Sequence, residues 1–329
     1  MRWPEGKGWT LLKRGLPPLV FAVCALTVVF AGLSALFSTG LREEMAVSLG
    51  RAPVETMVLF STHFFLNPWF YLVFAAVLAL EHFVPAAEGQ RPLSRGLRID
   101  LLWAVPKLLF HASLLPLYVL FLQHLYNRYF DWMTIDAVQR WPFWVRLLLA
   151  VLVGDFLFWL THLVRHKVGP LWHFHAVHHS QRELNFFTEY RVHPFDDVFA
   201  NTIGFLPLLM VKEGFASVVA VIWIRHWHTR VCHSNIKSNF GWLRYLLVTP
   251  QSHRVHHSVE PRHHDRNFGL TFSVWDYLFG TQYRGYDEYP ETGINEADFP
   301  HEQEGWRYAG LGTLWDQLVY PFKALVQTR

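Results

Sequence analysis

Long apolar runs separated by short polar segments dominate the first half of the chain. Four of these runs carry few or no charged side chains: Leu16–Phe37, Met57–Leu80, Leu101–Leu125 and Phe143–Val164. A helix rises about 1.5 Å per residue, so about 20 apolar residues cross the hydrocarbon core of a bilayer. Each run is long enough, and the pattern therefore predicts about four transmembrane helices in an all-α integral membrane protein.

A fifth apolar stretch, Ala200–Ile224, is interrupted by Lys212, Glu213 and Gly214. Each half has about ten residues, which is too short to span a bilayer, so we expect a re-entrant or interfacial helical hairpin. From Arg225 to Arg329 the chain is more polar and is predicted to form a helical cap on the membrane region.

Apolar residues near the C-terminus follow helical spacing: Leu311, Leu314, Trp315, Leu318, Phe322 and Leu325. They predict an amphipathic helix that lies on the membrane surface or packs against the cap. The expected domains are a transmembrane region in residues 1–142, a histidine-rich catalytic domain in residues 143–283 and a C-terminal tail with this helix in residues 284–329.

Lysine and arginine residues predict the orientation of the chain. Four of them precede the first apolar run, and three more fall at Arg91, Arg95 and Arg98, whereas the other two loops carry two each. Cytoplasmic loops of membrane proteins are enriched in these residues. With four spans, both termini and the cap are expected in the cytoplasm. The first run is too long for a typical signal peptide, so we interpret it as a retained span.

Composition narrows the class of protein. Of the 329 residues, 52% are hydrophobic and only 17% are charged, which excludes a disordered chain and is typical of one partly surrounded by lipid. The net charge of +3 comes from scattered residues with no basic stripe, so nucleic-acid binding is not expected. Cys24 and Cys232 are too few for a disulfide framework or a thiolate metal site.

The chain contains 20 histidines, and their spacing points to metal binding. His162 and His166 are four residues apart at the end of the fourth run, which places them on one helical face. A triplet with spacing i, i+3, i+4 follows and then recurs 78 residues later: His175, His178 and His179, then His253, His256 and His257. Eight imidazoles exceed the ligands of one ion, so two metal centres are predicted. Imidazole binds iron, zinc, copper and nickel, so ligand type leaves the metal open.

The motifs around these histidines resemble the fatty acid hydroxylase/sterol desaturase superfamily. They occur in the order of that superfamily, and the resemblance extends roughly from Glu81 to Tyr283. The motifs are DFLFWLTHLVRH from Asp155, LWHFHAVHHS, RVHPFDD, HSN at His233, TPQSHRVHHS, DRNFG and WDYLFGT from Trp275. One departure is Leu163, where the family often has arginine after the first histidine.

The resemblance implies the ligand set and its neighbours. The expected metal ligands are His162, His166, His175, His178, His179, His253, His256 and His257, with His233 as a further ligand and His228 as a weaker candidate. Three residues are candidates for orienting the ligands: Asp155, seven residues before His162 on the same helical face, His193 in RVHP, and Asp276 in WDYLFGT.

The family consists of membrane-bound, non-haem di-iron enzymes that use O2. By resemblance we expect two iron ions, O2 as co-substrate and a lipid substrate that is hydroxylated or desaturated at an unactivated C–H bond. The chain has no CxxCH, GxGxxG or ferredoxin pattern, so the electron donor is expected to be a separate protein, either cytochrome b5-like, a ferredoxin or a reductase. Two alternatives remain at this point: a membrane metal-binding or metal-transport protein, and a structural zinc site that braces the cap.

Overall fold

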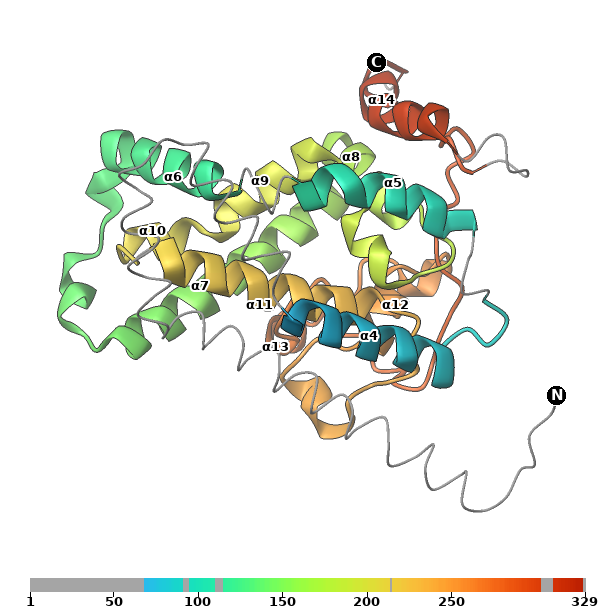
Figure 1. Cartoon of the computed structure of the whole chain (residues 1–329), viewed down its shortest axis with the longest axis horizontal. Coiled ribbons are helices and arrows are strands. Elements are labelled where there is room, and N and C mark those ends of the chain that lie inside the picture. The colour runs from blue at the N-terminus through green and yellow to red at the C-terminus, as the bar shows by residue number, and fades with distance from the viewer. Residues whose placement is uncertain (1–67, 91–94, 110–114, 214, 303–309, 328–329) are drawn as a thin grey trace.

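The computed structural model describes residues 68–90, 95–109, 115–213, 215–302 and 310–327. Within these ranges the regular elements are helices, accompanied by three isolated β-bridges and no strand, which confirms the all-α class. The α-helices, shown in Figure 1, are α4 (Pro68–Phe83), α5 (Arg95–Leu109), α6 (Leu115–Leu125), α7 (Phe143–Lys167), α8 (Gly169–His179), α9 (Pro194–Gly204), α10 (Leu206–Met210), α11 (Phe215–His233), α12 (Pro250–His256), α13 (Val274–Leu278) and α14 (Leu311–Gln327).

Helix α7 is the clearest candidate for a membrane-spanning element. It has 25 residues, and within the described part of the chain it is the one helix long and apolar enough to cross a membrane. It matches the predicted run Phe143–Val164. The predicted span Leu16–Phe37 lies outside the described residues, and so does the first part of Met57–Leu80, whose remainder belongs to α4. The described residues of Leu101–Leu125 fall in two helices, α5 and α6.

Two glycines allow α7 and α9 to pack closely. A Cβ atom on Gly154 would lie 2.7 Å from the carbonyl oxygen of Gly204, and a Cβ atom on Gly204 would overlap the ring of Phe158. Any larger residue at either position would force the two helices apart. Phe158 and Phe205 meet edge to face beside this contact and belong to a buried apolar cluster between the helices.

The predicted helical hairpin is present as an element of the fold. Helices α9 and α10 run to Met210, the chain reverses at Lys212, which has a left-handed φ of 49°, and α11 returns alongside them (Figure 1). Helix α11 does not stop at Arg225, however, where we expected the cap to begin. It continues to His233, so the polar composition begins inside a packed helix.

Arg225 shows why its charge was a misleading boundary signal. Only 9% of the residue is exposed, its guanidinium lies 4.2 Å from the ring centroid of Phe158, and Nη2 donates to Asn201 Oδ1 at 2.8 Å. A cation–π contact together with a hydrogen bond satisfies a buried guanidinium. The charge therefore helps to join α7, α9 and α11.

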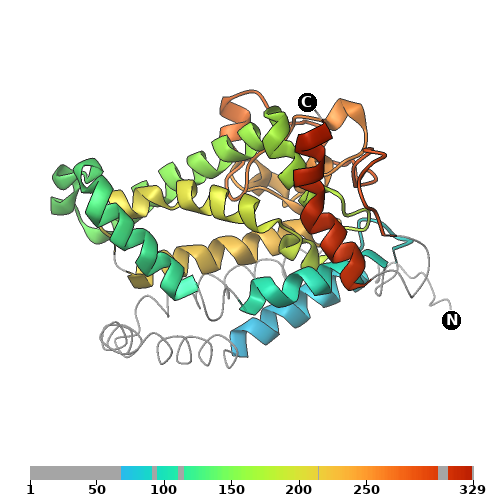
Figure 2. The same cartoon turned by 90° about the horizontal axis from the view of Figure 1, so that it is seen from above.

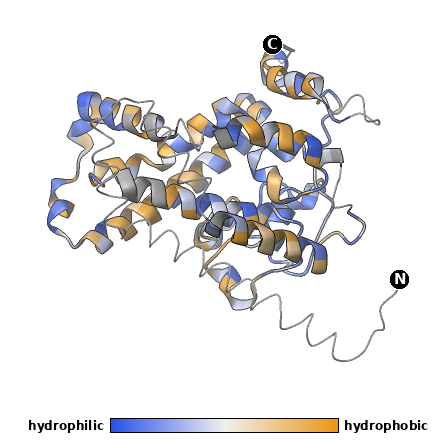
Figure 3. Cartoon of the chain, in the orientation of Figure 1, coloured by the Kyte–Doolittle hydropathy of each residue, from blue (hydrophilic) through white to orange (hydrophobic). Residues whose placement is uncertain are grey.

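Helices α8, α12 and α13 and their loops gather around the C-terminal half of α7. Helix α14 packs against α8 and α5, and Figure 2 shows it crossing them. The predicted C-terminal helix is confirmed as α14. Its Tyr320 and Ala324 are buried in a cluster with Ile99 of α5, while Trp315 is exposed on the opposite face. Figure 3 shows α4 as mainly hydrophobic, whereas α12 and the loops next to it, with their many histidines and arginines, are largely hydrophilic.

Candidate metal centre

Nine histidines converge in two groups at the C-terminal end of α7. In each group the candidate ligand atoms all lie within 4.8 Å of one another. The first group, called the five-histidine group, contains His162, His166, His175, His179 and His256; the second, called the four-histidine group, contains His178, His233, His253 and His257. The structure thus brings together the eight histidines of the three motifs and His233.

The two triplets divide between the groups, whereas the sequence pattern placed all three imidazoles of each triplet on one face. His175 and His179 face the five-histidine group, but His178 faces the other one; conversely, His253 and His257 belong to the four-histidine group, and His256 to the first. Residues i and i+4 diverge by only about 40° on a helix, while neighbours diverge by about 100°. Each triplet therefore supplies both groups and ties them together.

Backbone carbonyls fix the tautomers in the four-histidine group. Nδ1 of His178 donates to the carbonyl of Arg191 at 3.1 Å, and Nδ1 of His233 donates to that of Thr229 at 2.7 Å. Both Nε2 atoms must then carry lone pairs. They lie only 2.9 Å apart, and His253 Nε2 lies 2.8 Å from His233 Nε2. Lone pairs facing each other repel, but two nitrogens that each lie about 2.1 Å from a shared ion would be about 3 Å apart.

The five-histidine group also has nitrogen lone pairs that lack a partner and that a metal ion would bind. Nδ1 of His162 donates to the Phe268 carbonyl and Nδ1 of His256 to the Arg266 carbonyl, both at 2.8 Å. The Nε2 atoms of His162, His166 and His256 are buried and have no hydrogen-bond partner. A buried polar atom without a partner costs about 1–3 kcal/mol. A metal ion would bind all three lone pairs, so the residues present fit a metal.

Burial also keeps the imidazoles neutral, as metal ligation requires. It lowers the pKa of His178 and His257 well below the ordinary value for histidine, and the charge of the neighbouring imidazoles lowers it further. A neutral imidazole offers a lone pair, whereas an imidazolium offers only donors.

Two carboxylates that the sequence analysis missed contact the groups. Asp196 Oδ2 accepts from His175 Nδ1 at 2.9 Å and also pairs with Arg165 at 3.0 Å. Such a carboxylate fixes the orientation of a ligand imidazole and increases its basicity. Asp196 lies in the RVHPFDD motif, so a signal was present.

Glu189 is the corresponding carboxylate at the four-histidine group. It accepts from His226 Nδ1 at 2.9 Å, and its second oxygen lies 3.4 Å from His233 Nδ1. Burial alone would raise the pKa of Glu189, but the hydrogen bond from His226 and the charge of Lys107 hold it well below its ordinary value. It is a single acid in the apolar sequence FFTEY, and no spacing marked it.

Asp276 reaches the five-histidine group through the backbone. Its carboxylate accepts from the backbone N–H groups of Phe268 and Gly269 at 2.8 and 2.7 Å. The carbonyl of Phe268 in turn accepts from His162. Asp155 binds the neighbouring segment, because it accepts from the backbone of Thr271 and Phe272. Both acids thus hold the loop that orients His162, without contacting an imidazole themselves.

The other two predicted residues lie outside the two groups. His193 caps α9 by accepting from the N–H of Phe195 at 3.1 Å, and its Nε2 lies 3.2 Å from the carbonyl oxygen of Leu318 on α14. His228 lies one turn before Cys232 on α11, with its Nε2 3.5 Å from that sulfur. The structure therefore does not bring His228 to either candidate metal site.

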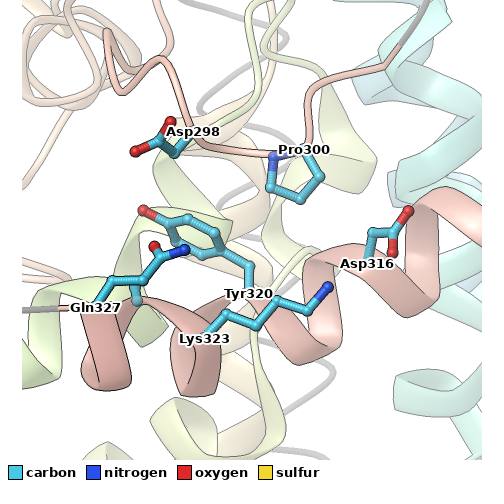
Figure 4. Close-up of a pocket in the computed structure, with 7 residues that line it drawn as sticks. Asp298, Pro300, Asp316, Tyr320, Lys323 and Gln327 are labelled. Carbon is cyan, nitrogen blue, oxygen red and sulfur yellow. The ribbon is translucent and has the colours of Figure 1, made fainter.

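A cavity of about 470 Å³ opens directly beside the five-histidine group. Its lining includes His166, His179 and His256 together with Trp172 and Ile294. A second cavity of about 480 Å³, drawn in Figure 4, lies between α14 and the segment around Pro300; Lys323, Asp298 and Asp316 line it, and it contains no histidine. Of these two cavities, the first is the one that reaches the histidine groups.

A helix able to span a membrane, ending beside two groups of histidines that could each hold a metal ion, defines a helical protein with two candidate metal sites. Residues 147–281 match the fatty acid hydroxylase family. The match contains all nine histidines of the two groups and confirms the resemblance found in the sequence motifs.

Curated relatives agree with this assignment. The ornithine lipid hydroxylase OlsE of Rhizobium tropici is 30% identical over 143 residues, which cover 44% of this chain and 43% of that protein. The alkylglycerol monooxygenase of Caenorhabditis elegans is 29% identical over 195 residues, covering 56% of this chain and 35% of that protein. The chain thus spans less than half the length of these relatives. No solved structure matches it.

Proposed function

We propose that this protein is an O2-dependent di-iron lipid oxygenase embedded in the membrane, with its histidine groups and both termini on the cytoplasmic side. The observation that carries the proposal is the convergence of nine histidines, eight of them buried, whose lone pairs face one another in two groups. In the proposed reaction, a lipid C–H bond, O2, two electrons and two protons yield an alcohol and water.

Some of the residues would bind the two ions, and others orient the side chains that bind them. The five-histidine group and the four-histidine group would each hold one iron ion, and when bound the irons would supply the redox and O2 chemistry that side chains lack. Asp196 orients His175, and the carbonyls of Phe268 and Thr229 orient His162 and His233. Burial of the imidazoles limits their contact with bulk water to the cavity beside the five-histidine group.

Two observations support a lipid substrate and a hydroxylation. The relatives are named an ornithine lipid hydroxylase and an alkylglycerol monooxygenase, and both names describe oxygen insertion into lipids. The cavity beside the five-histidine group is of the size that ligand pockets have; Trp172, Val259 and Ile294 make part of its lining apolar, and the rest is mostly polar. We propose that the reacting C–H bond lies there. Electrons come from a separate protein such as a cytochrome b5-like protein, a ferredoxin or a reductase.

Metal transport is the rival function, and the position of the groups argues against it. Transport sites lie near the bilayer midplane between discontinuous helices. Here His162 and His166 lie in the last turns of α7, and the other seven histidines come from segments packed around that end.

The test is metal analysis of the purified full chain combined with product analysis. We expect about two iron ions per chain and, with a reductant, 18O2 and a lipid extract, a product that carries one labelled oxygen atom. Protein loaded with zinc is the matched control, because zinc has no redox chemistry. Two tightly bound zinc ions without an O2-dependent product, or metal flux into vesicles, would contradict the proposal.

A further inference from the structure

Six large apolar side chains are exposed together on two short segments that contain none of the candidate metal ligands. The segments are the 3-10 turn η6 (Gly241–Tyr245) with Leu246, and α13 with Phe279. The exposed fractions range from 37% to 74% for Trp242, Tyr245, Leu246, Val274, Leu278 and Phe279, which we call the aromatic platform. Apolar groups of this size are rarely left in water without a partner.

Hydrogen bonds hold the two halves of the aromatic platform together. Ser273 donates its N–H to the carbonyl of Leu246 at 3.0 Å and its hydroxyl to that of Arg244 at 2.8 Å. Leu247 and Phe272 form an isolated antiparallel bridge next to these bonds. The exposed side chains therefore project from one fixed unit.

The aromatic platform continues the apolar surface of α7. Phe279 stacks on Trp159 at 4.6 Å, and its ring centroid lies 5.8 Å from that of Phe156. Phe156 lies on the same face of α7 as Leu152 and Leu160, which are both exposed. At about 1.5 Å per residue, Trp159 is about 12 Å from the last residue of α7. This places the platform near the end of the spanning helix, at the level of a membrane interface.

The aromatic platform carries fewer exposed charged side chains than the neighbouring segment from Glu260 to Arg266. In the platform segments the charged residues are Arg244, whose guanidinium lies 4.4 Å from the ring centroid of Tyr286, and Asp276, which is buried. The segment from Glu260 to Arg266, by contrast, exposes acids and bases in alternation. Tryptophan, tyrosine and arginine at the end of an apolar helix are typical of contact with lipid headgroups.

We propose that the aromatic platform inserts into the bilayer interface beside α7 and thereby sets the depth of the five-histidine group relative to the lipid. Asp276 lies within α13 and binds the backbone of Phe268, and the carbonyl of Phe268 orients His162. Asp155 of α7 binds the same loop through Thr271 and Phe272. The lipid contact and the metal ligand are thus parts of one rigid unit. The inference concerns membrane contact and does not depend on the reaction.

Site-directed spin labels test the platform in the full chain. Labels are attached to Trp242→Cys and Leu278→Cys, each in a Cys24→Ser background and reconstituted with one chain per lipid nanodisc. Arg262→Cys is the matched control, because the Arg262 side chain is also more than half exposed but lies in the charged segment. We expect accessibility to O2 to exceed accessibility to a water-soluble nickel reagent at both platform positions, and the reverse at the control.

Water-like accessibility at both platform labels would overturn the proposal. A label that is shielded from both reagents would also overturn it, because such shielding indicates a protein partner rather than lipid. Neither readout involves turnover, so failure of this inference is distinguishable from failure of the proposed oxygenase function.

Discussion

The two histidine groups share helices and ligand type but differ in their access to the outside. Three members of the five-histidine group, His166, His179 and His256, line the cavity of about 470 Å³. None of the four-histidine group lines that cavity, although the histidines of both groups are buried apart from the partly exposed His166. The groups are adjacent, since the rings of His179 and His257 stack at 4.2 Å.

This difference in access indicates that the two neighbouring sites have different roles. Metal sites that react keep a position accessible to substrate, whereas structural sites are closed by protein ligands. The five-histidine group has the access that a reacting molecule needs. The four-histidine group is enclosed, so we expect it to act through the ion in the open group rather than by contacting the lipid.

Removal of one ligand from each group has the largest expected effect. We expect His256→Ala and His178→Ala each to lower turnover at least about 100-fold, because losing residues that merely orient ligands already costs about 10–100-fold. Metal content should fall from about two ions toward one per chain, measured by elemental analysis. His124→Ala is the control, since His124 is exposed at the end of α6, far in sequence from both groups.

Added imidazole tests, in the same two variants, whether the five-histidine group is accessible from the cavity and the four-histidine group is not. His256 lines the cavity, so free imidazole should reach the space left in His256→Ala and restore part of the metal content. His178 does not line the cavity, and its variant should not recover. Equal recovery in both variants would refute the difference in access, and unchanged turnover in both would remove the ligand assignment.

The carboxylates give a second, smaller comparison. Asp196→Asn keeps the shape of the side chain but weakens its bonds to His175 and Arg165. Glu189→Gln makes the same change beside His233, whose Nδ1 has a closer partner in the carbonyl of Thr229. We therefore expect about a 10-fold to 100-fold loss of metal affinity or activity for Asp196→Asn and less for Glu189→Gln. Metal titration of both variants measures this, and the reverse order would show that the carbonyl does not orient His233.

Local spacing explains what the sequence predicted well. The i, i+4 and i, i+3, i+4 patterns depend only on helix geometry, and so the sequence alone predicted that the motif histidines would gather as candidate metal ligands. The division of each triplet between two groups could not, because it depends on how α8 and α12 face each other. Arg225 and Glu189 were missed for the same reason, since their partners come from other helices.

The smallest expected effect concerns His228, which is close to a candidate ligand in the sequence but belongs to neither histidine group. It lies five residues before His233 on α11, but its Nε2 faces Cys232 Sγ at 3.5 Å, and burial lowers its pKa to about 4, so it is a neutral residue outside both groups. We expect His228→Ala to bind about two metal ions and to keep turnover within about twofold of the unmodified chain. Its unfolding temperature should fall by a few degrees, because truncation of a partly buried side chain usually costs about 1 kcal/mol. If this variant lost one metal ion while circular dichroism showed an intact fold, His228 would be a tenth histidine of the site. The four-histidine group as defined above would then lack one of its ligands.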